Sequence, residues 1–87
     1  MTPVLIPSQL QAYTGGASRV DVEGASVAEV LDALDRKFPG IRFRVIDEQD
    51  RIRKHMRLFV GQERQFDIAG ALRNGDEVLI FGALSGG

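Results

Sequence analysis

Residues 26–40, SVAEVLDALDRKFPG, predict one amphipathic helix, and this helix sets the fold class. Ser26 suits the N-cap position, and Glu29, three residues later, completes a capping box in which side chains bind the free N–H groups of the first turn. Pro39-Gly40 ends the helix. The apolar residues between these signals recur at helical spacing and form one stripe: Val27, Val30, Leu31, Leu34 and Phe38.

Short segments on both sides of this helix have the composition and alternation of β-strands. Two precede it, at Val4-Leu5-Ile6 and from Ser18 to Glu23, where Val20 and Val22 alternate with charged residues. Three follow it, at residues 56–60, 65–66 and 77–81. Because a single amphipathic helix needs one apolar sheet face to cover it, the sequence predicts a two-layer α+β domain.

Two segments after the helix have a less regular pattern. In residues 41–54 apolar residues are interleaved with many charged ones, so we expect a partly ordered connection over the sheet edge. Residues 67–72 are compatible with one helical turn.

Composition and charge restrict the function. The 87 residues suffice for one domain, and eleven Lys plus Arg against twelve Asp plus Glu give no electrostatic case for binding nucleic acid. Without cysteine there is no thiol nucleophile and no zinc knuckle, and His55, the only histidine, is most simply a solvated residue. We expect no metal site and no autonomous catalysis. No segment predicts a secretory signal or a membrane span, so the expected location is the cytoplasm.

The strand pattern predicts an apolar patch on the sheet face away from the helix. If Val78 and Ile80 face the helix, then Phe59, Leu79 and Phe81 lie on the opposite face. Such a patch indicates a docking surface for a partner, unless residues 41–54 fold over it. Both interpretations stay open at this point. The basic residues between Arg42 and Arg57 are either a solvated face or a rim that meets an acidic partner.

The last residues are Ala83-Leu84-Ser85-Gly86-Gly87, directly after the final predicted strand. Because glycine has no Cβ, Gly86 and Gly87 can pass through a narrow channel and present the carboxylate of Gly87 to a buried site. Leu84 and Ser85 belong to the same channel segment, with Leu84 as an apolar anchor. We therefore divide the chain into a domain of residues 1–82 and a flexible tail of residues 83–87.

With these features the whole chain resembles the ubiquitin-like sulfur carriers, the MoaD/ThiS-like proteins. The resemblance rests on the order of elements, on the turn Arg73-Asn74-Gly75-Asp76-Glu77-Val78 and on the terminal Gly86-Gly87. It implies a β-grasp fold, a mixed sheet packed on one main helix. Tyr13-Thr14-Gly15-Gly16 and the long connection of residues 40–57 look most like the carriers of a cysteine route.

The resemblance also implies a function, that of a carrier rather than an enzyme. A partner adenylating enzyme would activate the Gly87 carboxylate with ATP, and a persulfide protein would supply the sulfur of a terminal thiocarboxylate. A downstream synthase in molybdopterin, thiamine or cysteine synthesis would consume it, and the carrier itself would bind no cofactor. Two alternatives are a protein modifier that forms an isopeptide bond to lysine, and an interaction module in which Gly-Gly has no chemical role.

Overall fold

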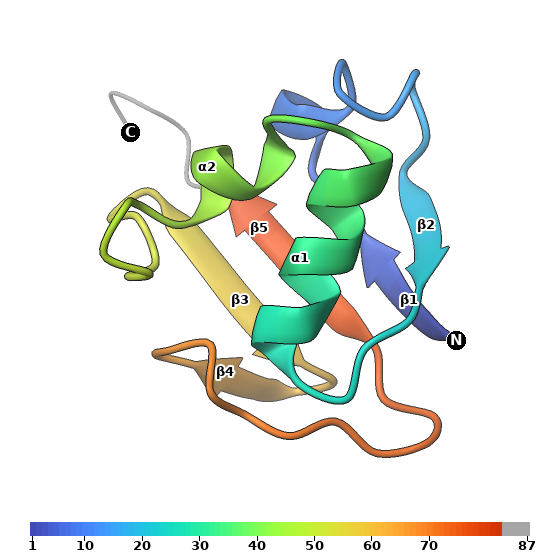
Figure 1. Cartoon of the computed structure of the whole chain (residues 1–87), viewed down its shortest axis with the longest axis vertical. Coiled ribbons are helices and arrows are strands. Elements are labelled where there is room, and N and C mark those ends of the chain that lie inside the picture. Colours follow the sequence, from blue (N-terminus) through green and yellow to red (C-terminus); the bar gives the residue numbers. More distant parts are fainter. Residues whose placement is uncertain (83–87) are drawn as a thin grey trace.

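The computed structural model of the chain describes residues 1–82 and shows a curved sheet with helices on one side (Figure 1). The elements follow one another as β1 (Thr2–Leu5), the 3-10 helix η1 (Ser8–Leu10), β2 (Arg19–Val22), α1 (Val27–Lys37), α2 (Ile41–Val45), β3 (Met56–Val60), β4 (Glu63–Gln65) and β5 (Val78–Gly82). The predicted helix and all the predicted strands are present, with small shifts at their ends.

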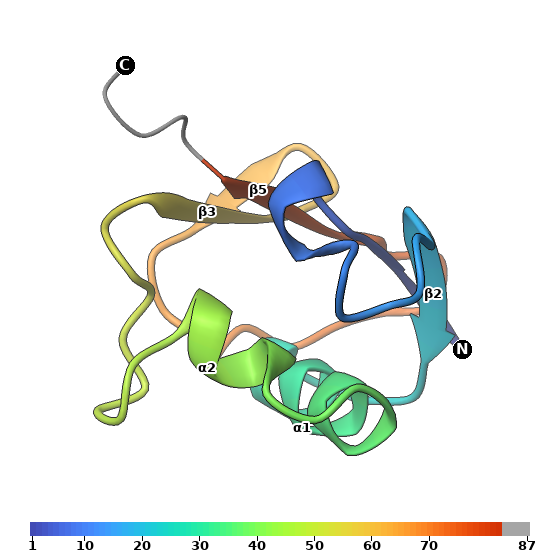
Figure 2. The same cartoon turned by 90° about the horizontal axis from the view of Figure 1, so that it is seen from above.

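The sheet is mixed and has β5 at its centre. Its strand order is β2-β1-β5-β3-β4, with β1 and β5 parallel and the other neighbours antiparallel. Seen from above, α1 and α2 lie on the same side of the sheet (Figure 2). The structure therefore confirms the predicted α+β architecture of a mixed sheet packed on one main helix.

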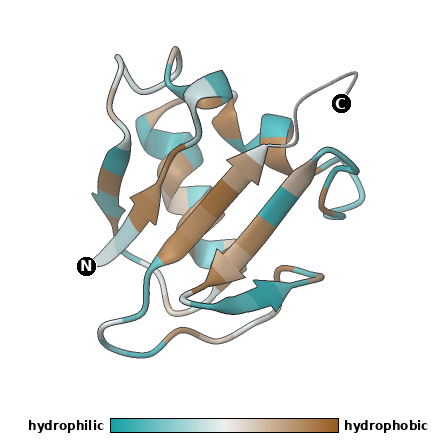
Figure 3. Cartoon of the chain, turned by 180° about the vertical axis from the view of Figure 1, so that it is seen from behind, coloured by the Kyte–Doolittle hydropathy of each residue, from teal (hydrophilic) through white to brown (hydrophobic). Residues whose placement is uncertain are grey.

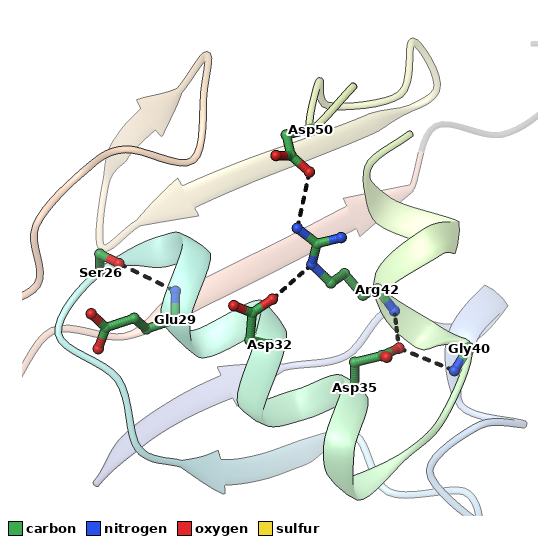
Figure 4. Close-up of polar contacts among 7 residues, drawn as sticks. All are labelled: Ser26, Glu29, Asp32, Asp35, Gly40, Arg42 and Asp50. Atoms are coloured by element: carbon green, nitrogen blue, oxygen red, sulfur yellow. Dashed lines mark hydrogen bonds and ion pairs between the residues drawn. The ribbon is translucent and has the colours of Figure 1, made fainter. Parts of the chain in front are cut away.

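The predicted capping box forms at the start of α1. The Ser26 side chain accepts a hydrogen bond from the backbone N–H of Glu29 at 3.2 Å (Figure 4). The Glu29 carboxylate accepts one from the backbone N–H of Ala25 at 3.0 Å, one residue before the N-cap. These two hydrogen bonds give partners to backbone donors at the start of the helix. The negative charge of the Glu29 carboxylate is also favourable there, because the helix dipole is positive at this end.

The prediction of a helical turn in residues 67–72 is wrong. This segment is irregular and lies against the start of α1, where the carbonyl of Gly70 accepts from Val27 N (3.0 Å) and that of Ile68 accepts from Ala28 N (2.9 Å). The first N–H groups of a helix have no partner within the helix. The carbonyls of Gly70 and Ile68 supply those partners from outside, so they are not used in a turn of their own.

The core lies between the sheet and the two helices. The apolar residues of α1 pack into this core. Leu31 and Leu34 are fully buried, and Phe38 packs at the border of the core. From the sheet, the residues that face α1 are buried: Val4, Val20, Val22, Met56, Leu58, Val78 and Ile80.

The prediction of a partly ordered connection over the sheet edge in residues 41–54 is also wrong for its first part. Ile41, Val45 and Ile46 have no exposed surface and belong to the core beside α1. The one turn of α2 places Ile41 and Val45 on the same helical face, which explains why the adjacent arginines remain near the solvent. The helices described within residues 1–82 include none that is long and apolar enough to cross a bilayer.

Candidate functional site

Strands β1, β5 and β3 consist largely of hydrophobic residues, with one hydrophilic segment within β3 (Figure 3). Leu79 on β5 pairs with Phe59 on β3 and with Leu5 on β1, so these three side chains form a row across the sheet. The rings of Phe59 and Phe81 meet edge to face, with centroids 5.5 Å apart and planes at 84°. Phe81 is 47% exposed and the other three are half-buried. The predicted patch of Phe59, Leu79 and Phe81 is therefore one surface.

Leu5 is a member of this patch that the sequence analysis missed. The alternation of Val4, Leu5 and Ile6 could have indicated that Leu5 points away from the core, since both neighbours are buried. Its place beside Leu79 depends on the parallel pairing of β1 with β5, which local sequence does not encode. We call Leu5, Phe59, Leu79 and Phe81 the open-face patch.

Arginines surround this patch on several sides. In the strand register Arg19 lies next to Leu5, Arg64 next to Phe59 and Arg57 next to Phe81. A solvated apolar area with cationic neighbours suits a partner surface that combines apolar side chains with carboxylates.

Residues 41–54 do not supply the cover that the sequence analysis considered for this patch. Their helix α2 and Ile46 pack with α1, on the opposite side of the sheet (Figure 2). Two interpretations were left open, an exposed patch and a patch covered by residues 41–54. Phe81 agrees with the first, because nearly half of its surface is accessible.

Arg42 is the residue that fixes the 41–54 segment to α1. Its Nε lies 2.9 Å from an oxygen of Asp32, at ion-pair distance but without the alignment of a hydrogen bond, and its Nη2 donates to Asp50 at 3.0 Å (Figure 4). Asp35 on α1 accepts the backbone N–H groups of Gly40 and Arg42 at 3.0 and 3.1 Å, which caps α2. Arg42 thus has a structural role and is not part of a free basic rim.

Asp47 organises the loop that follows. One of its carboxylate oxygens accepts the backbone N–H of Arg51 at 3.0 Å and that of Gln49 at 2.9 Å. These hydrogen bonds, the one from Arg51 foremost, hold the pKa of Asp47 below its ordinary value because they favour the charged form. His55 is exposed, and residues 1–82 contain no group of three or more acidic or histidine side chains arranged to hold a metal ion.

The predicted sulfur-attachment residue Gly87 and its neighbours Leu84, Ser85 and Gly86 lie outside the described residues. The last described residue is Gly82, which pairs with Met56 at the end of β5. The structure therefore fixes the point from which residues 83–87 continue. That point is next to Phe81 and so adjoins the open-face patch.

Comparisons with known proteins find similar chains along almost the full length. The model of the ThiS family matches residues 4–87. The sulfur carrier protein CysO of Mycobacterium bovis is 30% identical over 89 aligned positions, which cover 97% of this chain and 96% of that protein.

Solved structures give the same result. A chain in the crystal structure of the Amycolatopsis orientalis BexX/CysO complex superposes with a TM-score of 0.91 at 28% identity, over the whole of both chains. The small archaeal modifier protein 1 of Haloferax volcanii superposes with a TM-score of 0.78 at 29% identity, over 99% of this chain and 98% of that one. These neighbours confirm the β-grasp fold that the resemblance implied.

Proposed function

We propose that the carboxylate of Gly87 is the group that becomes loaded with sulfur, because this chain belongs to the ThiS family. It is a ubiquitin-like sulfur carrier rather than an enzyme. The observation that supports this most directly is the match of the family model through residue 87, together with the Gly86-Gly87 sequence that it includes. The proposal requires Gly87 to have a free carboxylate.

The proposed chemistry has two stages, both on partner proteins. First, a Gly87 carboxylate oxygen attacks the α-phosphorus of ATP on an adenylating enzyme, pyrophosphate leaves, and an acyl-adenylate forms. Then the terminal sulfur of a donor persulfide attacks the carbonyl carbon and AMP leaves. A thiol cleaves the resulting acyl disulfide, which releases the thiocarboxylate and leaves the donor as a disulfide. The carrier needs no cysteine for any of these steps, consistent with its composition.

We further propose that the open-face patch is the main docking surface for the adenylating enzyme. Phe81 is half-exposed and precedes the last described residue, so a protein that covers it also lies beside the start of the tail. Gly86 and Gly87 would then enter a channel too narrow for side chains, with Leu84 and Ser85 in its entrance. CysO-type carriers work with partner proteins, as the BexX/CysO complex illustrates.

Among the possible pathways we propose a cysteine route. The curated relatives at 30% identity are sulfur carriers named CysO. Two separate features of the sequence resemble such carriers, Tyr13-Thr14-Gly15-Gly16 and the connection of residues 40–57. The downstream partner would be a synthase that transfers the sulfur to an amino-acid precursor.

The experiment is intact-mass analysis of the chain isolated from its own cells, and of the purified chain after incubation with ATP, the cognate adenylating enzyme and a persulfide donor. The expected result is the mass change of one oxygen exchanged for sulfur, located on the C-terminal peptide. A chain that keeps its carboxylate under all these conditions would refute the carrier chemistry.

A second candidate function is protein modification. It is favoured by the structural similarity to small archaeal modifier protein 1 of Haloferax volcanii. The same isolation distinguishes the two, because a modifier gives a series of larger conjugates in which Gly87 is linked to lysine side chains, and these persist under denaturing and reducing conditions.

A further inference from the structure

A second surface feature lies at the β4 edge of the sheet, beside the open-face patch. It is a pocket of about 290 Å³ between the start of β3, the end of β4 and the preceding loop. Six of the residues that line it define what we call the basic pocket: Arg53, Lys54, Met56, Arg57, Arg64 and Phe66. Four of these are cations, and none of the lining residues is acidic.

The four cations of this pocket form no ion pair with another described side chain, although the charge of Arg53 also acts on the carboxylate of Asp47. Within residues 1–82 the ion pairs are those of Arg42 with Asp32 and Asp50, and of Arg51 with Asp47. None of these groups is a member of the basic pocket. Like charges gathered in one place repel each other, and an anion bound among them relieves that repulsion.

Three of the guanidinium groups are held in position by contacts with groups that carry no net charge. Arg57 Nη1 donates to the carbonyls of Lys54 (2.7 Å) and Met56 (3.0 Å). Arg53 Nε donates to the carbonyl of Phe43 at 2.7 Å. Arg64 lies over the ring of Phe66, 4.6 Å from its centroid. Side chains ordered in advance lose less entropy when a ligand binds, so the pocket is prepared for an anionic group.

The basic pocket also adjoins the end of β5. In the register of β3 with β5, Met56 lies opposite Gly82 and Arg57 opposite Phe81. Arg57 and Arg64 additionally border the open-face patch at Phe81 and Phe59. A protein that covers Phe81 therefore also lies next to the basic pocket, since Arg57 is the neighbour of Phe81 on the adjacent strand.

We propose that the basic pocket receives an acidic segment of the enzyme that acts on Gly87, with Asp or Glu carboxylates on its cations and an apolar side chain against Met56 and Phe66. This inference rests on the proposed function for the identity of the partner. A protein segment fits better than a free anion, because the pocket combines an apolar floor with cations and is continuous with the proposed docking surface.

The first test uses the folded chain alone and a synthetic probe. The peptide Glu-Leu-Glu-Leu-Glu is titrated while the backbone amide resonances are followed, with Gln-Leu-Gln-Leu-Gln as the neutral control. We expect shifts confined to residues 52–57 and 64–66, weakened by added salt because exposed charges are screened. Inorganic phosphate is titrated at the same ionic strength. If phosphate saturates these amides at lower concentration than the acidic peptide, the pocket is a small-anion site and the proposal is overturned.

Variants make the test specific. The double variant Lys54→Gln/Arg64→Gln removes two charges and keeps the carbonyl contacts of Arg57. Its matched control is Arg36→Gln/Lys37→Gln, which removes two exposed charges from the last turn of α1. We expect affinity for the acidic peptide to fall at least about tenfold in the first variant and to stay unchanged in the second. Equal losses in both variants would show attraction by net charge alone and would overturn the proposal.

The second test measures the dissociation constant for the cognate adenylating enzyme and, separately, thiocarboxylate formation at saturating carrier. The Lys54→Gln/Arg64→Gln variant should bind at least about tenfold more weakly yet be loaded fully at saturation. Unchanged binding with normal loading refutes the pocket and leaves the proposed function intact. Absence of loading in the parent chain refutes the proposed function, and the peptide titration then decides the pocket independently.

Discussion

Arg42 on α2 places its Nε 2.9 Å from the carboxylate of Asp32 on α1 and its Nη2 3.0 Å from that of Asp50. One side chain thereby joins the main helix, the short helix and the loop after it. The Arg42 side chain is partly buried, with 30% of its surface exposed, and both Asp32 and Asp50 are more exposed to solvent.

The first prediction follows from this exposure. Arg42→Gln should lower the free energy of unfolding by about 1 kcal/mol, because exposed ion pairs contribute at most about that much each. Urea melts measure the change, with the exposed Arg44→Gln as a control that should stay near the parent. A loss as large as that of a core truncation would mean that Arg42 is needed for the packing of α2 itself.

A second prediction concerns two fully buried residues on different helical segments. Leu34→Ala on α1 and Ile46→Ala after α2 should each cost about 2–5 kcal/mol, because both leave a cavity in the core. The half-exposed Phe43→Ala is the control for truncation at the surface of α2. If Ile46→Ala unfolds at the same denaturant concentration as the parent, residues 41–46 are not part of the core.

The third prediction tests the open-face patch. Phe81→Ala should weaken binding to the cognate adenylating enzyme by at least about 1 kcal/mol, since exposed aromatics at interface centres are frequent anchors. The circular dichroism spectrum should not change. Tyr13→Ala, which removes another exposed aromatic ring beside Gly40, should bind like the parent. The reverse order of effects would move the docking surface to the region around Tyr13.

A fourth prediction addresses Gly86 and Gly87. Deleting Gly87 retracts the carboxylate by one residue, about 3.5 Å, which exceeds the tolerance of an in-line displacement at phosphorus. Gly86→Val adds a branched side chain in the proposed channel. Both variants should fold like the parent but lose ATP–pyrophosphate exchange with the partner, whereas Ser85→Ala should retain it. Normal thiocarboxylate formation on the shortened chain would contradict the proposed function.

The fifth prediction concerns pH and the loop after α2. Because the pKa of Asp47 is lowered in the folded chain, its charged form stabilises the loop above its ordinary value of 3.8. That contribution declines as the pH falls through the lowered folded value. Amide exchange at Gln49 and Arg51 should therefore accelerate, relative to the rest of the chain, only in this acidic range. Asp47→Asn should show faster exchange already at neutral pH.

The parts of the fold that could be predicted are those with local and repeated signals. The capping box and about three turns of apolar spacing defined α1, and Val20 and Val22 defined β2 by alternation. The single turn of α2, with the sequence IRFRV, alternates apolar and charged residues in the manner of a strand, and this alternation concealed the helical pair Ile41 and Val45. The segment with Ile68 and Gly70 is shaped by N–H groups of α1 that are distant in sequence, so no local pattern could predict it.

The candidate site was predictable to a similar extent. Alternation assigned Phe59, Leu79 and Phe81 to one face, and the register confirmed it. Leu5 was missed because its contact with Leu79 depends on a parallel pairing between the two ends of the chain. The basic pocket depends on the approach of loop residues 52–54 to β4, which is set by the geometry of the loop and not by its composition.

The central position of β5 has a mechanical consequence. β5 is bonded to β1 on one side and to β3 on the other, and the chain beyond Gly82 continues directly from it. Traction applied through that continuation acts along the strand, while the ladder bonds lie across it. Both ladders then resist in shear at the same time and cannot open one bond after another. In the proposed function, an enzyme that draws residues 83–87 into a channel would therefore pull on a strand that is anchored on both sides.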